Sequence, residues 1–117
     1  MWLKSIIEAE GFALNQLNYV FCSDEYLLNI NRQYLDHDFY TDIITFDNSE
    51  DDGMIEGDIF ISIERVSENA AELRKSFEEE LCRVLAHGVL HLVGFDDLED
   101  EQELEMRKKE DYYLAKL

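Results

Sequence analysis

The stretch "LCRVLAHGVLHLVGFDD", residues 81–97, is apolar on almost every side of a helix over its first thirteen positions, which is typical of a helix buried in a core. The polar exceptions are Arg83, His87 and His91, with Glu80 just before them. At ~100° per residue these side chains fall on one stripe. Because an unpaired buried polar group costs about 1 to 3 kcal/mol, the stripe requires partners or a pocket.

The spacing of the two histidines indicates a metal site. His87 and His91 are one helical turn apart, so both imidazoles can converge on a single cation, and zinc suits paired imidazoles. The alternative is two core histidines bonded to backbone carbonyls or carboxylates, which is the commoner origin of an H-x-x-x-H pair. In the helix motif of zincin proteases, the residue after the first histidine is the glutamate that acts as general base. Here that position is Gly88, so the helix geometry is shared and the general base is missing.

Two glycines favour the metal reading. Gly88 costs roughly 1 kcal/mol against alanine inside a helix, which makes sense if something approaches the backbone there. Gly94 follows the last helical residue and can turn the chain sharply, which would bring Asp96 or Asp97 back towards the histidines. A carboxylate is a competent third zinc ligand, and three protein ligands leave a fourth position for water.

The rest of the chain predicts an α+β domain around this helix. Ser76 followed by Glu79 fits a capping box and places the start of the central helix near 77 and its end near 93, and Ser23 is a candidate N-cap for an earlier helix. Further helices are predicted at 2–10, 23–35, 64–74 and 99–117, and strands at 17–23, 42–46 and 57–63, the last two as a hairpin. We expect a small mixed β-sheet of three to four strands packed with helices, in a zincin-like arrangement, as a single domain spanning 1–117.

Composition limits the function classes. The chain has 117 residues and a net charge of −18, from 28 acidic and 10 basic residues, so its surface repels nucleic acid and anionic membranes at long range. We expect no membrane partner, because no apolar stretch approaches the ~18 residues of a membrane span. The two cysteines are too few for a disulfide framework, which favours a cytoplasmic protein with buried thiols.

Three stretches in order carry a resemblance to a known family. They are "TDIITF" (41–46), "GDIFIS" (57–62) and "HGVLHLVGFDD" (87–97), and the last closely resembles the H-G-x-L-H-L-x-G-Y-D-H motif of the YbeY family. Members of that family are bacterial ribosomal RNA maturation factors and metal-dependent single-strand endoribonucleases. The resemblance therefore implies a zinc-dependent endoribonuclease that processes small-subunit ribosomal RNA in ribosome maturation or quality control. It also implies one zinc ion per chain, with single-stranded RNA, the small ribosomal subunit and its basic proteins as partners.

The resemblance also assigns site residues, with departures. His87 and His91 match two zinc ligands, and Asp97 falls where the family has a third histidine, so an oxygen donor replaces a nitrogen. The basic residue usual before the T-D strand falls on Leu35, so its suggested part in phosphate chemistry is not carried over. The family usually has a further strand before the first helix, for which this chain begins too late.

Three other residues have open roles. Arg83 lies one turn before His87 and is a candidate catalytic residue that neutralises phosphate charge, or else an ion-pair partner of Glu80 or another acid. Asp58 could orient a metal-binding histidine by a hydrogen bond to the ring nitrogen that does not face the metal. The alternative, and the commoner case, is a carboxylate at a strand end without such a role. His37, in a loop, receives no role.

Two other functions stay open at this stage. One is a metallohydrolase of another substrate such as a peptide, which the net charge of −18 favours. The other is a non-catalytic ribosome assembly factor with structural zinc. A closed site with four protein ligands would favour the assembly factor, and an open, solvent-reached position would favour an enzyme.

Overall fold

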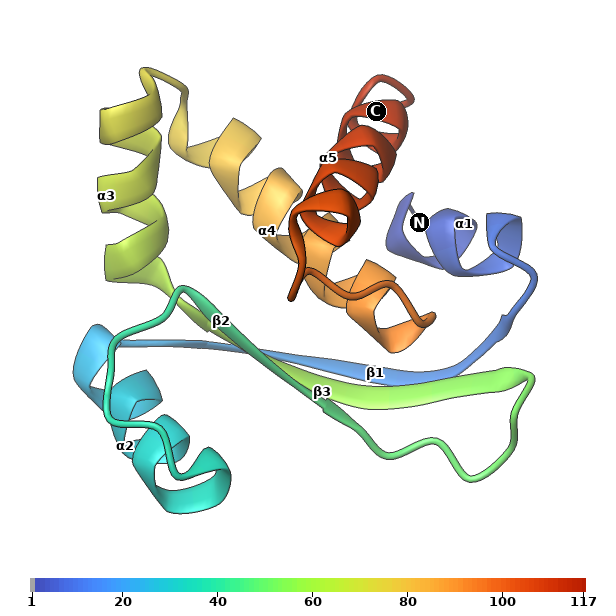
Figure 1. Cartoon of the computed structure of the whole chain (residues 1–117), viewed down its shortest axis with the longest axis horizontal. Helices are drawn as coiled ribbons and strands as arrows, with labels where there is room; N and C mark the ends of the chain where they lie inside the picture. Colours follow the sequence, from blue (N-terminus) through green and yellow to red (C-terminus); the bar gives the residue numbers. More distant parts are fainter. Residues whose placement is uncertain (1) are drawn as a thin grey trace.

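The computed structural model describes residues 2–117, which form five helices and three strands (Figure 1). In chain order the elements are α1 (Trp2–Ala9), β1 (Ala13–Cys22), α2 (Asp24–Leu35), β2 (Ile43–Asp47), β3 (Met54–Ser62), α3 (Ile63–Leu73), α4 (Phe77–Leu92) and α5 (Asp100–Leu114). The α+β class predicted from the sequence is confirmed. No helix within this described part is long and apolar enough to cross a lipid bilayer.

The sheet is mixed, with the strand order β1-β3-β2. β3 pairs in parallel with β1 and antiparallel with β2, so the predicted hairpin is confirmed. β1 begins at Ala13, before the predicted start at 17, because Ala13 pairs with Met54, the first residue of β3. Backbone pairing with β3 thus extends the strand on both sides of an irregularity at Asn15, and the polar side chains of Asn15 and Gln16 gave no strand signal.

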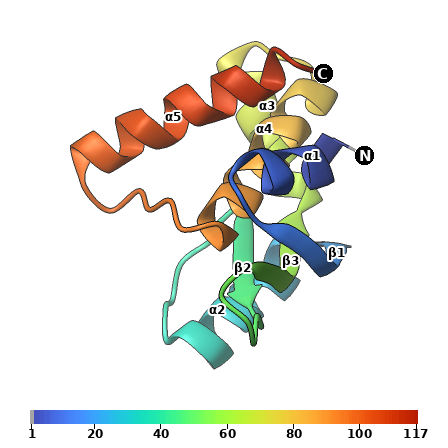
Figure 2. The same ribbon diagram turned by 90° about the vertical axis from the view of Figure 1, so that its right-hand side faces the viewer.

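Helices cover both faces of the sheet. α1, α3, α4 and α5 lie on one side and α2 on the other (Figures 1 and 2). The larger core is centred on Ile59 and Ile61 of β3 and on Val89 and Leu90 of α4, all with 0% exposure. A smaller core lies under α2 and contains Leu27, Ile30 and Ile44. This division leaves α4 sandwiched between the sheet and the other helices.

α4 is the central helix that the sequence predicts. It packs against α1, α3 and α5 as well as against β2 and β3. Its start carries the expected capping box: the Ser76 hydroxyl accepts from the Glu79 amide at 3.1 Å, and the Glu79 carboxylate accepts from the Ser76 amide. Ser23 likewise caps α2 by accepting from the Tyr26 amide. These caps fix where α4 and α2 begin, and the start of α4 sets the direction of its polar stripe.

Candidate metal centre

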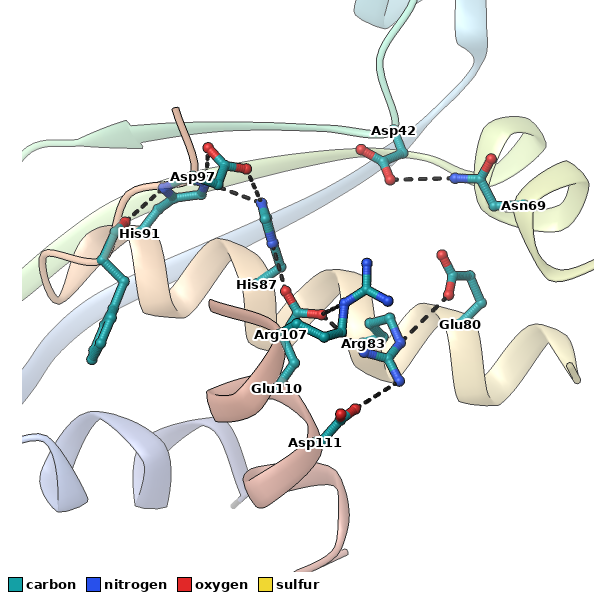
Figure 3. A network of polar contacts seen from close by, with 11 residues as sticks. Asp42, Asn69, Glu80, Arg83, His87, His91, Asp97, Arg107, Glu110 and Asp111 are labelled. Carbon is teal, nitrogen blue, oxygen red and sulfur yellow. Dashed lines mark hydrogen bonds and ion pairs between the residues drawn. The ribbon is translucent and has the colours of Figure 1, made fainter. Parts of the chain in front are cut away.

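The polar stripe of α4 brings the two histidines together. The rings of His87 and His91 lie 4.6 Å apart between centroids and are nearly perpendicular (Figure 3). Their Nε2 atoms are 3.0 Å apart. Each side chain is about a quarter exposed, at 24% and 25%. The pair is therefore held by the helix and still reached by solvent.

The turn after α4 returns an aspartate to the same place. Gly94 has a φ of +107°, and its amide donates to the His91 carbonyl while the Phe95 amide donates to the Leu90 carbonyl at 3.0 Å. These two bonds make a Schellman motif, the helix ending that a glycine in this conformation permits. Asp97 then lies with its Oδ2 3.2 Å from Nε2 of His87 and its Oδ1 3.6 Å from Nε2 of His91.

Both imidazoles are held by hydrogen bonds at Nδ1, the ring nitrogen that faces away from the other histidine. Nδ1 of His87 lies 2.7 Å from the Glu110 carboxylate, and Nδ1 of His91 lies 2.9 Å from the Phe95 carbonyl oxygen. Both partners are acceptors only, so each Nδ1 carries the proton and donates it. In the neutral imidazoles the Nε2 lone pairs then point at each other across 3.0 Å, next to a carboxylate. A positive charge between these atoms, either a metal ion or a proton, would relieve the repulsion between their electron pairs.

The spacing of these donors fits a zinc ion. Ligand atoms of His87, His91 and Asp97 all lie within 4.8 Å of one another, and we call these residues the metal triad. With zinc–ligand bonds of about 2.0 to 2.1 Å in a tetrahedron, neighbouring ligand atoms are roughly 3.3 Å apart. The distance of 3.0 Å between the two Nε2 atoms and that of 3.2 Å from Nε2 of His87 to Oδ2 of Asp97 are close to this value, and the other carboxylate oxygen lies 3.6 Å from Nε2 of His91. Two nitrogens and one oxygen are also a donor set that zinc accepts.

A buried ion-pair network supports the triad. Glu110 of α5 is 4% exposed, and one of its oxygens accepts from Nη1 of Arg83 at 3.0 Å while the other meets His87. Arg83 also donates to Asp111 at 3.1 Å and lies 4.0 Å from Glu80 (Figure 3). The arginine thus holds Glu110 in place, and Glu110 holds the ring of His87. An acid that bonds a metal-ligating histidine from behind sets its tautomer and increases its basicity.

Charges around the triad raise the pKa of His87. Burial by itself lowers that pKa, but the hydrogen bond and negative charge of Glu110, with Asp97 and Asp42, outweigh it. The pKa of His87 therefore lies above its ordinary value of 6.5. Burial also raises the pKa of the Asp42 and Glu80 carboxyls, which face the same region. The site as a whole is electronegative and favours a bound positive charge.

Two cavities adjoin the triad, one on each side. The first, of about 380 Å³, is lined by Arg83, Arg107 and Glu110 together with His87 and Asp97. The second, of about 470 Å³, lies towards α2 and is lined by all three members of the triad. Among residues 2–117 the group of convergent ligands holds only these three side chains. The site is therefore open to solvent, with room for a further ligand.

The residues assigned from the sequence have different positions in the structure. His87, His91, Asp97 and Arg83 lie together at one site, and Asp97 rather than Asp96 faces the histidines, whereas Asp96 is exposed. Asp58 orients neither histidine: its carboxylate accepts from Asn18 and Asn48, so it is a strand carboxylate, the commoner of the two roles considered.

Glu110 is the functional residue that sequence reasoning missed. Its signal was present, because Met106, Glu110 and Tyr113 follow helical spacing and all three are buried. An acid in line with apolar residues on one helix face indicates a buried partner. The sequence cannot tell which partner, because that depends on how α5 docks on α4.

Comparison with known proteins assigns a family. The family model described as "Endoribonuclease YbeY" matches residues 1–117. The chain belongs to the YbeY family. A YbeY relative from Cytophaga hutchinsonii, named "Endoribonuclease YbeY", is 57% identical over 114 residues, which cover 97% of this chain and 80% of that protein. One of the same name from Flavobacterium psychrophilum is 56% identical over 113 residues, again covering 97% and 80%.

A solved structure also resembles this YbeY chain. The solution structure of a Thermotoga maritima protein superposes with a TM-score of 0.66 at 33% identity. The match covers 97% of this chain and 75% of the other. The family expected from the stretches at 41–46, 57–62 and 87–97 is thereby confirmed.

Proposed function

We propose that this protein is a metal-dependent endoribonuclease that cleaves single-stranded RNA, with zinc held by His87, His91 and Asp97. The observation that carries the proposal is the pair of Nε2 atoms 3.0 Å apart beside a carboxylate, in a chain whose family members are named endoribonucleases. When bound by these residues, zinc would supply Lewis acidity, which would lower the pKa of a bound water towards neutrality and polarise a phosphoryl oxygen. The same proposal places the protein in processing of small-subunit ribosomal RNA.

The surrounding residues have supporting roles in this proposal. Glu110 and the Phe95 carbonyl hold the imidazoles so that both Nε2 atoms face the same point. The two cavities supply space for the RNA strand on either side of the triad. Arg83 remains a candidate catalytic residue because it lines the first cavity, although its guanidinium is engaged by Glu110 and Asp111.

The two alternatives receive less support. A non-catalytic assembly factor with structural zinc would be expected to have a closed site, and here three ligands border two cavities. A zincin-type peptidase would need a general base at position 88, where this chain has glycine.

Partners and organisation complete the proposal. We infer that the small ribosomal subunit and its basic proteins present the RNA, which the net charge of −18 supports. We further infer a cytoplasmic location and a single domain over residues 1–117. The bond from the Trp2 indole to the Tyr113 carbonyl oxygen, at 3.0 Å, ties the first helix to the last and supports that single unit.

The central experiment measures metal and activity together. Purified wild type should contain about one zinc ion per chain by elemental analysis and should cut single-stranded RNA, while His91→Ala should lose both zinc and cleavage. Asp96→Ala is the control, because this exposed acid lies beside the triad without facing it. Cleavage that persists in His91→Ala, or wild type that binds no added zinc, would contradict the proposal.

The partner is tested with a charge variant. Glu99, Asp100 and Glu101 are exposed acids at the start of α5 that line neither cavity, and we change all three to Gln or Asn. If this surface docks basic ribosomal proteins, the variant loses cleavage of pre-ribosomal particles and keeps cleavage of naked RNA. Equal loss on both substrates, with the fold intact, would argue against docking.

A further inference from the structure

The cavity on the α2 side of the metal triad has an aromatic wall. Besides the triad, its lining includes Leu35 at the end of α2 and His37 and Phe39 from the loop that leads to β2. No role could be assigned to His37 from the sequence. Its ring stacks on that of Phe39, with 5.1 Å between centroids and 22° between planes. The wall and the triad therefore face one continuous space of about 470 Å³.

The loop holds these two rings in an exposed position. Asn31, only 2% exposed, donates from its side chain to the Phe39 carbonyl oxygen at 2.9 Å, and its own carbonyl accepts from the His37 amide at 3.1 Å. Asp38, which lies between His37 and Phe39 in the sequence, forms an ion pair with Arg32 of α2. Despite these anchors the Phe39 side chain stays 54% exposed. The fold thus fixes the backbone and leaves much of the stacked pair exposed to solvent.

The charges in this cavity select against recognition through phosphate. Among the described residues that line it, none is Lys or Arg, and Asp42 and Asp97 contribute negative charge. A phosphate backbone gains nothing from such a wall at long range. A nucleobase does gain, because every base has a π-face that stacks on an exposed aromatic ring and carries no charge. Single-stranded RNA offers such unstacked bases.

We propose that His37 and Phe39 form a nucleobase subsite, which stacks one base of a single-stranded RNA beside the metal triad. The subsite rests on the proposed endoribonuclease function and adds which residues bind a base of the substrate. A base held on this wall places the adjoining stretch of backbone in the shared cavity, in front of His87, His91 and Asp97. Leu35 gives the base an apolar edge in the same cavity.

The test uses a single-stranded RNA hexanucleotide that carries 2-aminopurine, whose fluorescence is quenched on stacking. Zinc-loaded wild type should bind and quench it, and Phe39→Ala should bind about tenfold more weakly with the quench lost. Phe39→Tyr should retain both, because it keeps the aromatic face. Phe21→Ala is the matched control: Phe21 is 53% exposed but lies outside the lining of both cavities. Quenching is read shortly after mixing, and gel analysis of the same samples limits the comparison to times before the oligonucleotide is cut.

The outcomes separate the subsite from the function. The Asn31 bond reaches the backbone of Phe39, so the alanine variant keeps the loop anchor, and circular dichroism checks its fold. If Phe39→Ala binds and quenches like wild type, the subsite is overturned even though RNA is cleaved. If wild type stacks the base in a Phe39-dependent way but cuts no RNA, the subsite stands and the endoribonuclease proposal fails. An abasic hexanucleotide that binds as tightly as the normal one would also overturn the subsite.

Discussion

Asp97 gives the site a donor that differs from its two neighbours. The triad combines two imidazole nitrogens with one carboxylate oxygen, and the carboxylate side chain is 35% exposed. An anionic ligand attracts any divalent cation more strongly than a neutral one, whereas a nitrogen ligand favours the borderline-soft metals. In the proposed metal site, the preference for one metal over another should therefore depend strongly on Asp97.

The first prediction concerns that residue. Asp97→Ala should weaken zinc binding by more than the ~10 to 100-fold typical of losing a supporting partner, because a direct ligand is lost. Asp97→His should bind zinc at least as tightly as wild type, and Asp96→Ala should change affinity little. Competition with a chromophoric chelator measures all three. Equal effects of the two alanine variants would show that the carboxylate is not a ligand.

The second prediction concerns Glu110 and pH. A zinc-ligating histidine must lose its proton, so zinc affinity falls as the pH drops through the raised pKa of His87. Glu110→Gln removes the negative charge that helps to raise this pKa and leaves only a weaker hydrogen bond to a neutral amide oxygen, so the pKa of His87 falls. The pH below which zinc is lost should therefore move down in the variant. At pH 8 its affinity should be about 10 to 100-fold weaker, because the ring of His87 is less firmly held. Zinc titrations from pH 5 to 8 measure both effects, and an unchanged midpoint would contradict this role for Glu110.

Much of the site could be predicted from local sequence, because local geometry produces it. The helical turn between His87 and His91 and the glycine turn at Gly94 place three ligands without help from distant parts of the chain. Glu110 lies 23 residues from His87 and reaches it only through the docking of α5 on α4. The partner of Arg83 was open for the same reason, and Glu110 rather than Glu80 makes the shorter contact.

At the scale of elements, close packing of α4 on the sheet depends on glycines. A Cβ on Gly88 would lie 2.7 Å from Cδ1 of Ile43 in β2, so the glycine lets this strand approach the helix between the two histidines. The sequence suggested an approach beside the metal, and the group that approaches is a strand side chain. On β3, a Cβ on Gly57 would lie 2.8 Å from the Phe46 carbonyl oxygen and 3.1 Å from Leu92 of α4.

The third prediction uses the difference between two glycines. Gly57→Ala should lower the free energy of unfolding by about 1 to 3 kcal/mol, because the Phe46 carbonyl is backbone and cannot move aside cheaply. Gly53→Ala is the matched control, since nothing lies within 4 Å of its added Cβ. Urea unfolding of the two variants gives the comparison. A Gly57→Ala protein as stable as Gly53→Ala would mean that the strand and helix can separate freely.

Elements with strong local signals were predictable, and strand ends were not. Ser23 and Ser76 mark helix starts through side-chain caps that need only a few neighbouring residues. The first residues of β1 and β3 are strand because Ala13 meets Met54, a pairing between segments far apart in sequence. The helix α1, of eight residues, was predictable from the sequence because its apolar residues Leu3, Ile6 and Ile7, which are buried, have helical spacing.

At the scale of the whole molecule, the charge of −18 sets the terms of RNA binding. Half of the ten basic residues lie in ion pairs with acids of the same chain, so their charge is compensated within the fold; they are Arg32, Arg65, Arg83, Arg107 and Lys109. Of these, Arg107 has a side chain that is 65% exposed, and it lines the cavity of about 380 Å³. Few cations are therefore placed to neutralise phosphates near the triad.

The last prediction follows from this shortage of cations. For single strands, the logarithm of the binding constant falls with the logarithm of salt concentration by about 0.7 per phosphate neutralised. With few contacts, the slope for the isolated protein should be shallower than about −2. Arg107→Ala should flatten it by roughly 0.7, because this exposed guanidinium borders the site.

Phe39→Ala should lower affinity by a similar factor at every salt concentration and leave the slope unchanged, because stacking releases no counterions. Fluorescence titrations of the 2-aminopurine hexanucleotide across a salt series measure the three slopes, with Lys4→Ala on α1 as the control for loss of a cation away from both cavities. A wild-type slope steeper than about −4 would show that phosphate contacts dominate, and the stacking wall would then be a minor part of how this acidic protein holds RNA.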